Sequence, residues 1–133
     1  EFLDLIRTKT VDLVFANEAE LTSLYQTEDF DKALAQLRND AQLAVVTRSE
    51  KGCVVVAKDV VSPVPAYPVK QVVDTTGAGD LFAAGFLFGI VRGLNHEQCG
   101  RLGALAAAEV IQHIGARPQA SLKALAQAAG LPV

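Results

Sequence analysis

The sequence is 133 residues long, has a formal net charge of −3, and is 50% hydrophobic. This length is enough for one domain that buries roughly two-thirds of the surface of its unfolded chain. Acidic and basic residues are interspersed, which argues against a nucleic-acid-binding surface. Charged residues interrupt the apolar stretches before they reach the length of a membrane span, so we expect no membrane association.

The predicted elements alternate between strands and helices. Short valine-rich runs predict buried strands, and apolar residues at helical spacing predict helices. In chain order we predict a strand over 11–16, helices over 17–25 and 31–39, strands over 43–47 and 53–57, a proline-bearing extended segment at a sheet edge over 63–68, a short strand at 72–73, a helix from Asp80, and helices over 95–113 and from 121.

These elements predict a layered α/β sheet with parallel strands and an appended hairpin, whose loop is 48–52. In such sheets ligands bind beyond the carboxyl ends of the strands. Asn17, Thr47 and the glycine turn at 77–79 each end or follow a predicted strand. We therefore expect these three places to converge on one edge of the sheet.

The segment 74–80 reads Asp-Thr-Thr-Gly-Ala-Gly-Asp and leads into the apolar run 81–91. A helix start exposes unpaired N–H groups and a partial positive charge, and glycines let a phosphate approach that backbone. A carboxylate beside such an anion cradle can take a proton from an attacking hydroxyl, as phosphoryl transfer requires. The alternative is purely structural, because strand-to-helix turns are often glycine-rich and Asp commonly caps helices.

Two other features each have a structural and a functional interpretation. Asn17 and Glu20 have the spacing of a capping-box variant, but one Glu can also help to hold Mg²⁺ through water. Cys53 and Cys99 lack the paired spacing of a disulfide framework, so we expect reduced thiols and a cytoplasmic protein. The acidic first residues and the absence of methionine predict no signal peptide and no unprocessed translation product.

Residues 74–89 resemble the C-terminal signature of the ribokinase / phosphofructokinase-B family of sugar and nucleoside kinases. Three further stretches match in the expected order, at 17–20, 45–52 and 113–118. The resemblance implies a ribokinase-like α/β fold. Residues 1–133 would then form its C-terminal nucleotide-binding and catalytic segment, without the N-terminal half that carries the acceptor pocket and a lid.

The resemblance also implies roles for particular residues. Asp80 would be the catalytic base, and the backbone of Gly77, Ala78 and Gly79 the anion hole. ATP would be held by Gly79 together with Asn17, Thr47, Arg48, Ser49, Glu50, Lys51 and Gly52. Glu20 would order Mg²⁺ through water. A monovalent cation, K⁺, would lie near Asp74, Thr76, Val110, His113 and Gly115.

The acceptor implied by the resemblance is a small sugar or nucleoside. The stretch 113–118 and the small residues over 103–108 favour an adenosine-kinase-like branch, with a ribokinase or fructokinase specificity as the near rival. Close helix packing is the alternative account of those small residues. A second hypothesis for the isolated segment is a nucleotide-binding or interaction module without turnover, which an exposed apolar edge could also bring together as a homodimer.

Overall fold

The structure is a computed structural model that describes residues 6, 13–57, 60–66, 77–112 and 122–132. The chain divides into two compact units, Glu1–Pro63 and Val64–Val133. Among the described residues, none of the helices combines the length and the apolar character that a membrane crossing needs.

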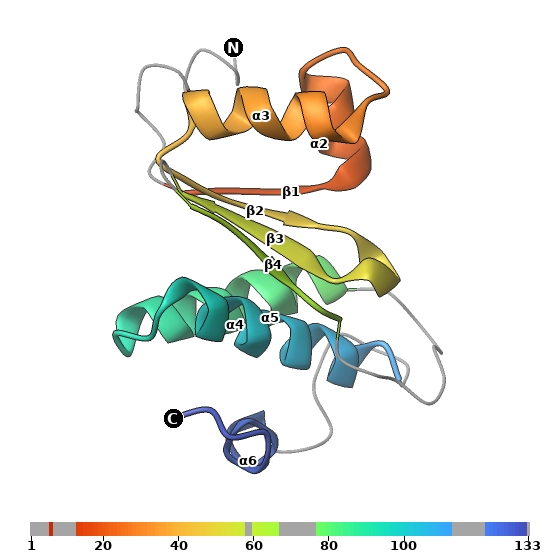
Figure 1. Ribbon diagram of the computed structural model, residues 1–133. Helices are drawn as coiled ribbons and strands as arrows, with labels where there is room; N and C mark the ends of the chain where they lie inside the picture. Colours follow the sequence, from red (N-terminus) through yellow and green to blue (C-terminus); the bar gives the residue numbers. More distant parts are fainter. Residues whose placement is uncertain (1–5, 7–12, 58–59, 67–76, 113–121, 133) are drawn as a thin grey trace. The chain divides into compact units, whose positions relative to one another are not determined.

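The first unit is built on a sheet with the strand order β1-β2-β3-β4. Strand β1 runs parallel to β2, and β2 pairs with β3 as an antiparallel hairpin. Helices α2 and α3 lie together on one face of this sheet (Figure 1). The elements in order are β1 (Val14–Asn17), α2 (Glu18–Leu24), α3 (Phe30–Asp40), β2 (Leu43–Thr47), the 3₁₀ turn η1 (Ser49–Lys51), β3 (Cys53–Ala57) and β4 (Val61–Val64).

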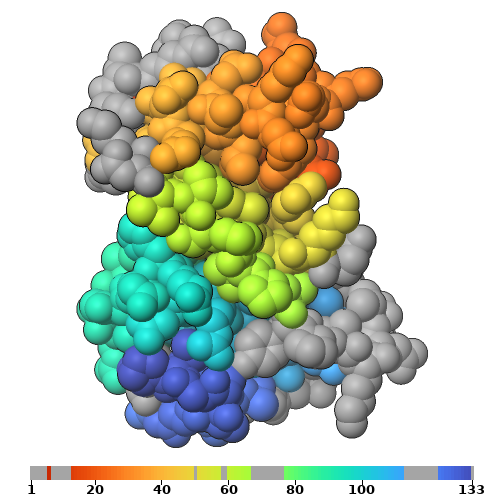
Figure 2. All heavy atoms as spheres, viewed as in Figure 1, coloured from red at the N-terminus to blue at the C-terminus, as the bar shows by residue number. Residues whose placement is uncertain are grey.

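The core of this unit lies between the two helices and the strands. Leu21 of α2 and Leu37 of α3 are fully buried, and they meet alternate residues of the strands, among them Val46 and Val56. Figure 2 shows the side chains of α2 and α3, in orange, as one continuous layer. Burial of these side chains fixes the start of α2 above the carboxyl end of β1, which positions the candidate site residues.

The described residues of the second unit form three helices, α4 (Ala78–Val91), α5 (His96–Val110) and α6 (Leu122–Ala128). Helices α4 and α5 pack closely because glycines on each let the other helix approach its backbone. A Cβ atom at Gly85 would lie 2.8 Å from the carbonyl oxygen of Leu102, and one at Gly103 would lie 2.8 Å from that of Phe82. Arg101 of α5 donates a hydrogen bond of 2.9 Å to the Ala129 carbonyl just beyond α6.

Most predicted elements are confirmed, including the strands over 43–47 and 53–57 and the hairpin between them. Pro63 lies in the edge strand β4, where a missing N–H donor is tolerated. Gly85 and Gly89, four residues apart on α4, both lie directly against α5. The predicted strand at 72–73 lies outside the described residues.

Several predicted boundaries were wrong: α5 ends at Val110 rather than at about 113, and two other differences fall on candidate site residues. Helix α4 begins at Ala78 rather than Asp80, because Gly77 alone makes the left-handed turn, with φ 78°. Gly79 therefore lies in the first turn of α4, where the backbone N–H groups have no hydrogen-bond acceptor within the helix. Strand β1 continues through Asn17 instead of ending before it, so Asn17 is both the last strand residue and the helix cap.

Candidate functional site

The start of α4 carries the strongest candidate for an anion site. The N–H of Leu81 donates the first helical hydrogen bond, 3.0 Å to the Gly77 carbonyl, so the N–H groups of Ala78, Gly79 and Asp80 precede the helical ladder. Among the described residues, no side chain caps them. Gly79 and Asp80 are exposed, and a Cβ atom at Gly79 would meet nothing within 4 Å among the described residues. This turn can hold an anion on its backbone, with a carboxylate beside it.

The start of α2 is built differently, because its cap is closed by side chains. The backbone N–H of Glu20 donates to Asn17 Oδ1 at 2.7 Å, and the N–H of Asn17 donates to Glu20 Oε1 at 2.9 Å. The capping-box interpretation of this pair is therefore confirmed. It occupies one oxygen of an exposed carboxylate, so Glu20 retains a second oxygen suited to a Mg²⁺-bound water.

Asn17 and Thr47 lie side by side, paired in the register between the parallel strands β1 and β2. Both residues are at the carboxyl ends of their strands, as expected for residues that share one edge of the sheet. The structure thus brings together two of the three places predicted to converge. The glycine turn belongs to the second unit.

The loop after Thr47 is closed by its own backbone. The N–H of Arg48 donates to the Gly52 carbonyl at 2.7 Å, and the N–H of Lys51 donates to the Arg48 carbonyl at 3.0 Å. Gly52 has φ 93°, a conformation that side chains disfavour, so a glycine is required there. Ser49 and Lys51 are exposed and available to a ligand. Glu50 belongs to η1, and its side chain lies outside the described part.

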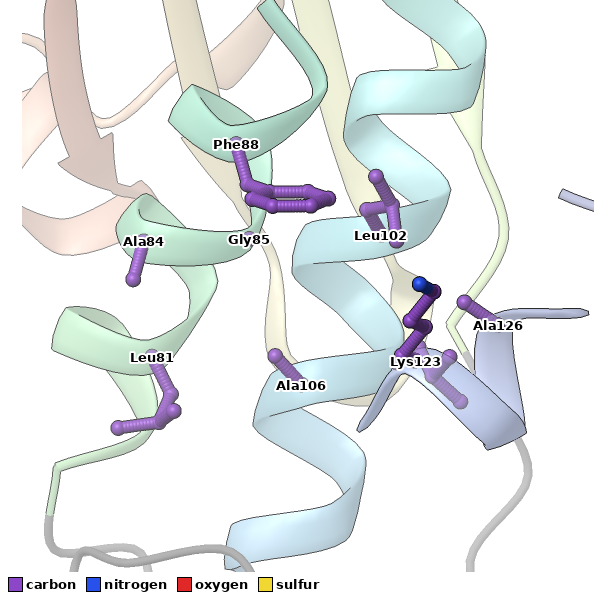
Figure 3. Close-up of a pocket in the computed structure, with 9 residues that line it drawn as sticks. Leu81, Ala84, Gly85, Phe88, Leu102, Ala106, Lys123 and Ala126 are labelled. Atoms are coloured by element: carbon purple, nitrogen blue, oxygen red, sulfur yellow. The ribbon is translucent and has the colours of Figure 1, made fainter. Parts of the chain in front are cut away.

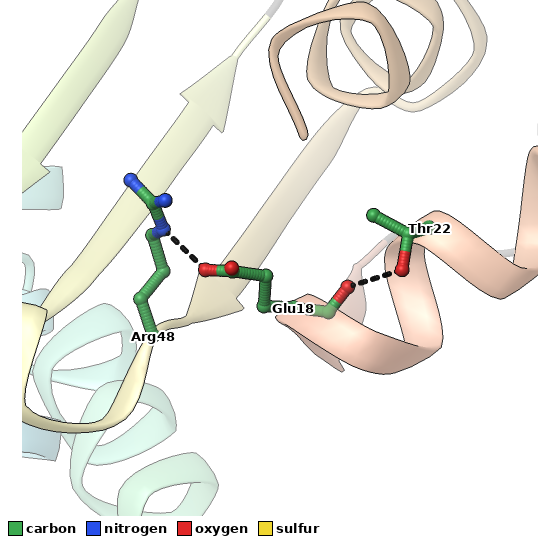
Figure 4. A network of polar contacts seen from close by, with 3 residues as sticks. All are labelled: Glu18, Thr22 and Arg48. Carbon is green, nitrogen blue, oxygen red and sulfur yellow. Dashed lines mark hydrogen bonds and ion pairs between the residues drawn. The ribbon is translucent and has the colours of Figure 1, made fainter. Parts of the chain in front are cut away.

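Arg48 has a structural partner that the sequence did not reveal. Its Nε donates to Glu18 Oε2 at 2.6 Å, and its guanidinium lies 3.8 Å from the ring centroid of Phe30. Figure 4 shows the contact between Arg48 and Glu18, with the Thr22 hydroxyl donating to the Glu18 carbonyl on the other side of Glu18. The hydrogen bond from Arg48 holds the pKa of Glu18 below its usual value. The sequence did contain a signal for this pair. Glu18 and Arg48 have opposite charges, and each directly follows the end of a strand, β1 and β2 respectively.

The predicted cation site is only partly within the described residues. Val110 is the last residue of α5, and carbonyls in the last turn of a helix lack an N–H partner within the helix. Asp74, Thr76, His113 and Gly115 lie outside the described residues. The part of the chain that the structure does describe holds no group of three or more His, Cys, Asp or Glu side chains arranged for a metal ion.

The second unit also contains an apolar cavity of about 280 Å³ between its three helices. Figure 3 shows Phe88 and Leu102 facing it from α4 and α5, with Lys123 and Ala126 on α6. Gly103 does not line this cavity but packs against Phe82. This contact confirms that close helix packing explains the small residue at position 103.

The buried cysteines take no part in these sites. Burial raises the pKa of the Cys53 thiol to about 12, and it raises the pKa of Cys99 as well. Both thiols are free, as expected.

Comparison with known proteins identifies the family. The sequence profile described as pfkB family carbohydrate kinase matches residues 2–123. The chain belongs to this family. It is 43% identical over 117 residues to a cytidine kinase of Thermococcus kodakarensis, an alignment that covers 84% of this chain and 42% of the relative.

Solved structures confirm the ribokinase-like fold. The adenosine kinase from Sinorhizobium meliloti superposes with a TM-score of 0.92 at 55% identity, over 96% of this chain and 39% of that one. The ribokinase of Arabidopsis thaliana, solved with ribose and ATP, superposes with a TM-score of 0.81 at 31% identity, over 94% of this chain and 43% of that one. The chain therefore spans less than half the length of these relatives.

Proposed function

We propose that the protein is an ATP-dependent kinase that transfers the γ-phosphoryl group to a hydroxyl or hydroxymethyl group of a sugar or nucleoside. Residues 1–133 would supply its nucleotide-binding and catalytic segment. Membership of the pfkB family supports the reaction class. The observation that carries the proposal is the open first turn of α4, where uncapped N–H groups stand beside the exposed carboxylate of Asp80.

In the proposed mechanism Asp80 accepts the proton of the attacking hydroxyl. The N–H groups of Ala78 and Gly79, with that of Asp80 itself, donate hydrogen bonds to the charge that develops on the transferred phosphoryl group. These donors need no rearrangement, because Gly77 holds the turn and no side chain of the described residues competes for them. Preorganised donors of this kind stabilise the transition state more than the ground state.

The nucleotide would bind along the carboxyl ends of β1 and β2. Thr47 and the loop 48–52 offer hydroxyl and backbone groups there, and Lys51 offers an exposed positive charge. Bound Mg²⁺ would neutralise phosphate charge. Asn17 and Glu20 are suited to hold its water shell, since the capping box leaves one Glu20 oxygen unused. A K⁺ site at the end of α5 stays a prediction.

We favour a nucleoside acceptor over a simple sugar. The relatives at 55% and 43% identity are an adenosine kinase and a cytidine kinase, whereas the ribokinase of Arabidopsis thaliana is 31% identical. Adenosine is therefore the first acceptor to test, and ribose or fructose is the nearest rival.

A coupled ADP-release assay of the full-length protein with adenosine, cytidine, ribose and fructose tests the proposal. We expect Mg²⁺-dependent turnover with at least one nucleoside. Calorimetry with Mg-ATP separates the remaining outcomes. ATP binding without turnover on any acceptor would favour the nucleotide-binding module, and an absence of ATP binding would contradict the kinase assignment.

The segment 1–133 by itself should bind ATP and show no turnover. Orientation of both reactants supplies on the order of 7–11 kcal/mol of the rate in well-organised sites, and this segment holds residues proposed for only one reactant. Robust phosphorylation by the segment alone would show that the acceptor site has been misplaced.

A further inference from the structure

Arg48 is held on two sides by residues from two different helices. Its Nε donates to Glu18 at 2.6 Å, and its guanidinium lies 3.8 Å from the ring centroid of Phe30. Glu18 is the first residue of α2 and Phe30 the first residue of α3. Only 26% of the Arg48 side chain is exposed, against 42% of Glu18. We name these three residues the Arg48 clamp.

The geometry of the clamp favours a fixed position for Arg48. An exposed ion pair alone contributes little, because solvent screens it and two flexible side chains must be ordered. Here the planar guanidinium is also stacked on an aromatic ring, so the orientation that serves the ion pair is already selected. The ion pair with Glu18 and the stack on Phe30 thus hold the guanidinium group of Arg48 in one orientation.

The backbone of Arg48 closes the loop that its side chain anchors. Its N–H donates to the Gly52 carbonyl, and its carbonyl accepts from Lys51. Glu18 directly follows Asn17, and Arg48 directly follows Thr47, its neighbour in the sheet register. The clamp therefore ties the loop 48–52 to the turn of α2 that carries the capping box.

We propose that the Arg48 clamp is a positioning device, which sets the loop 48–52 against Asn17 and Glu20 for nucleotide binding, and that Arg48 is not itself a phosphate ligand. This inference rests on the proposed kinase function. It narrows the role of Arg48, which the sequence resemblance placed among the residues that hold ATP.

The substitution Glu18→Gln distinguishes the two roles, because it removes the ion pair and leaves Arg48 in place. If Arg48 positions the loop, the KM for ATP should rise roughly three- to tenfold with little change in kcat, as expected when binding is lost equally in the ground and transition states. If Arg48 binds phosphate, freeing it from Glu18 should leave ATP binding unchanged or tighter.

A double-mutant cycle in the full-length protein completes the test. For a positioning role, Glu18→Gln, Arg48→Gln and the double variant should raise the ATP KM by similar factors, while the acceptor KM stays near wild type. An Arg48→Gln effect at least tenfold larger than that of Glu18→Gln would overturn the proposal, and so would an unchanged ATP KM in both.

Phe30→Leu provides a second variant that leaves both charges intact. It should raise the ATP KM in the same direction by a smaller factor, and an unchanged KM would remove Phe30 from the clamp. Thermal unfolding of each variant checks that it is folded. A wild-type protein that binds no ATP would contradict the kinase function itself, a result distinct from any outcome of the cycle.

Discussion

Helix α4 uses glycine in opposite ways at its start and in its middle. A Cβ atom at Gly79, in the first turn, would meet nothing within 4 Å among the described residues. A Cβ atom at Gly85 would lie 2.8 Å from a carbonyl oxygen of α5, and one at Gly89 would lie 2.8 Å from Cys99 Sγ. The middle glycines make room for a neighbouring helix, whereas Gly79 leaves room that no described part of the protein fills.

The helix starts show the same contrast. Helix α2 begins with a capping box between Asn17 and Glu20, and α5 begins with one between Asn95 and Gln98. Helix α4 begins after Gly77 and has no side-chain cap from the part of the chain that the structure describes. A Gly cap is less stabilising than a Ser, Asp or Asn cap by only about a few tenths of a kcal/mol, so Gly77 is a small cost in stability. An open cap is useful only where the N–H groups serve another partner, as in the proposed site.

The largest effect should come from Asp80→Asn in the full-length protein. Loss of a general base lowers the rate by about 10²–10⁴-fold, while ATP affinity should be kept. Asp80 is exposed, so the unfolding free energy should change little. Steady-state kinetics and calorimetry measure the two quantities. Activity within a few-fold of wild type would refute the assignment of the base.

Gly79→Val should come next, with a loss of roughly 10²–10³-fold in kcat, the cost of one lost donor in comparable anion holes. The added methyl groups would stand where the phosphate approaches the backbone. Valine and glycine differ by less than about 0.5 kcal/mol in helix propensity, so urea unfolding should be nearly unchanged. Survival of both ATP affinity and rate would reduce this turn to a structural connection.

In contrast to the two preceding substitutions, which should leave stability nearly unchanged, Gly85→Ala should destabilise the fold by about 1–3 kcal/mol, as overpacking usually does. The nearest atom is the backbone carbonyl of Leu102 at 2.8 Å, which cannot rotate away as a side chain can. Chemical denaturation with an unchanged m-value is the measurement. Wild-type stability would show that α4 and α5 can separate at no cost.

Gly79→Ala is the matched control for Gly85→Ala and should change stability in the opposite direction. The same methyl group on the same helix meets open space here, so the fold should gain up to about 1 kcal/mol from the better helix propensity of alanine. ATP binding should still weaken, because the methyl group narrows the approach to the backbone. Tighter ATP binding together with higher stability would separate this turn from the phosphate site.

Local patterns in the sequence predicted much of the fold. The valine-rich runs predicted β2 and β3 with their observed ends, and Asn17 and Asn95 were correctly expected to start helices. These features depend on neighbours within a few residues, so propensity and spacing are sufficient. The start of α4 was placed two residues late, because the sequence does not show which glycine of Gly77-Ala78-Gly79 makes the left-handed turn.

The sequence by itself determined the family, the reaction class proposed for it and the residues of the glycine turn, because these depend on the order of residue types along the chain. Only the tertiary structure decided that Glu18 and Phe30 hold Arg48, since Glu18 and Arg48 are 30 positions apart and meet only once β1 and β2 pair. It also decided at which glycines of α4 a neighbouring helix fills the space that a side chain would take. The space around a glycine depends on how the helices pack, and no local sequence pattern predicts it.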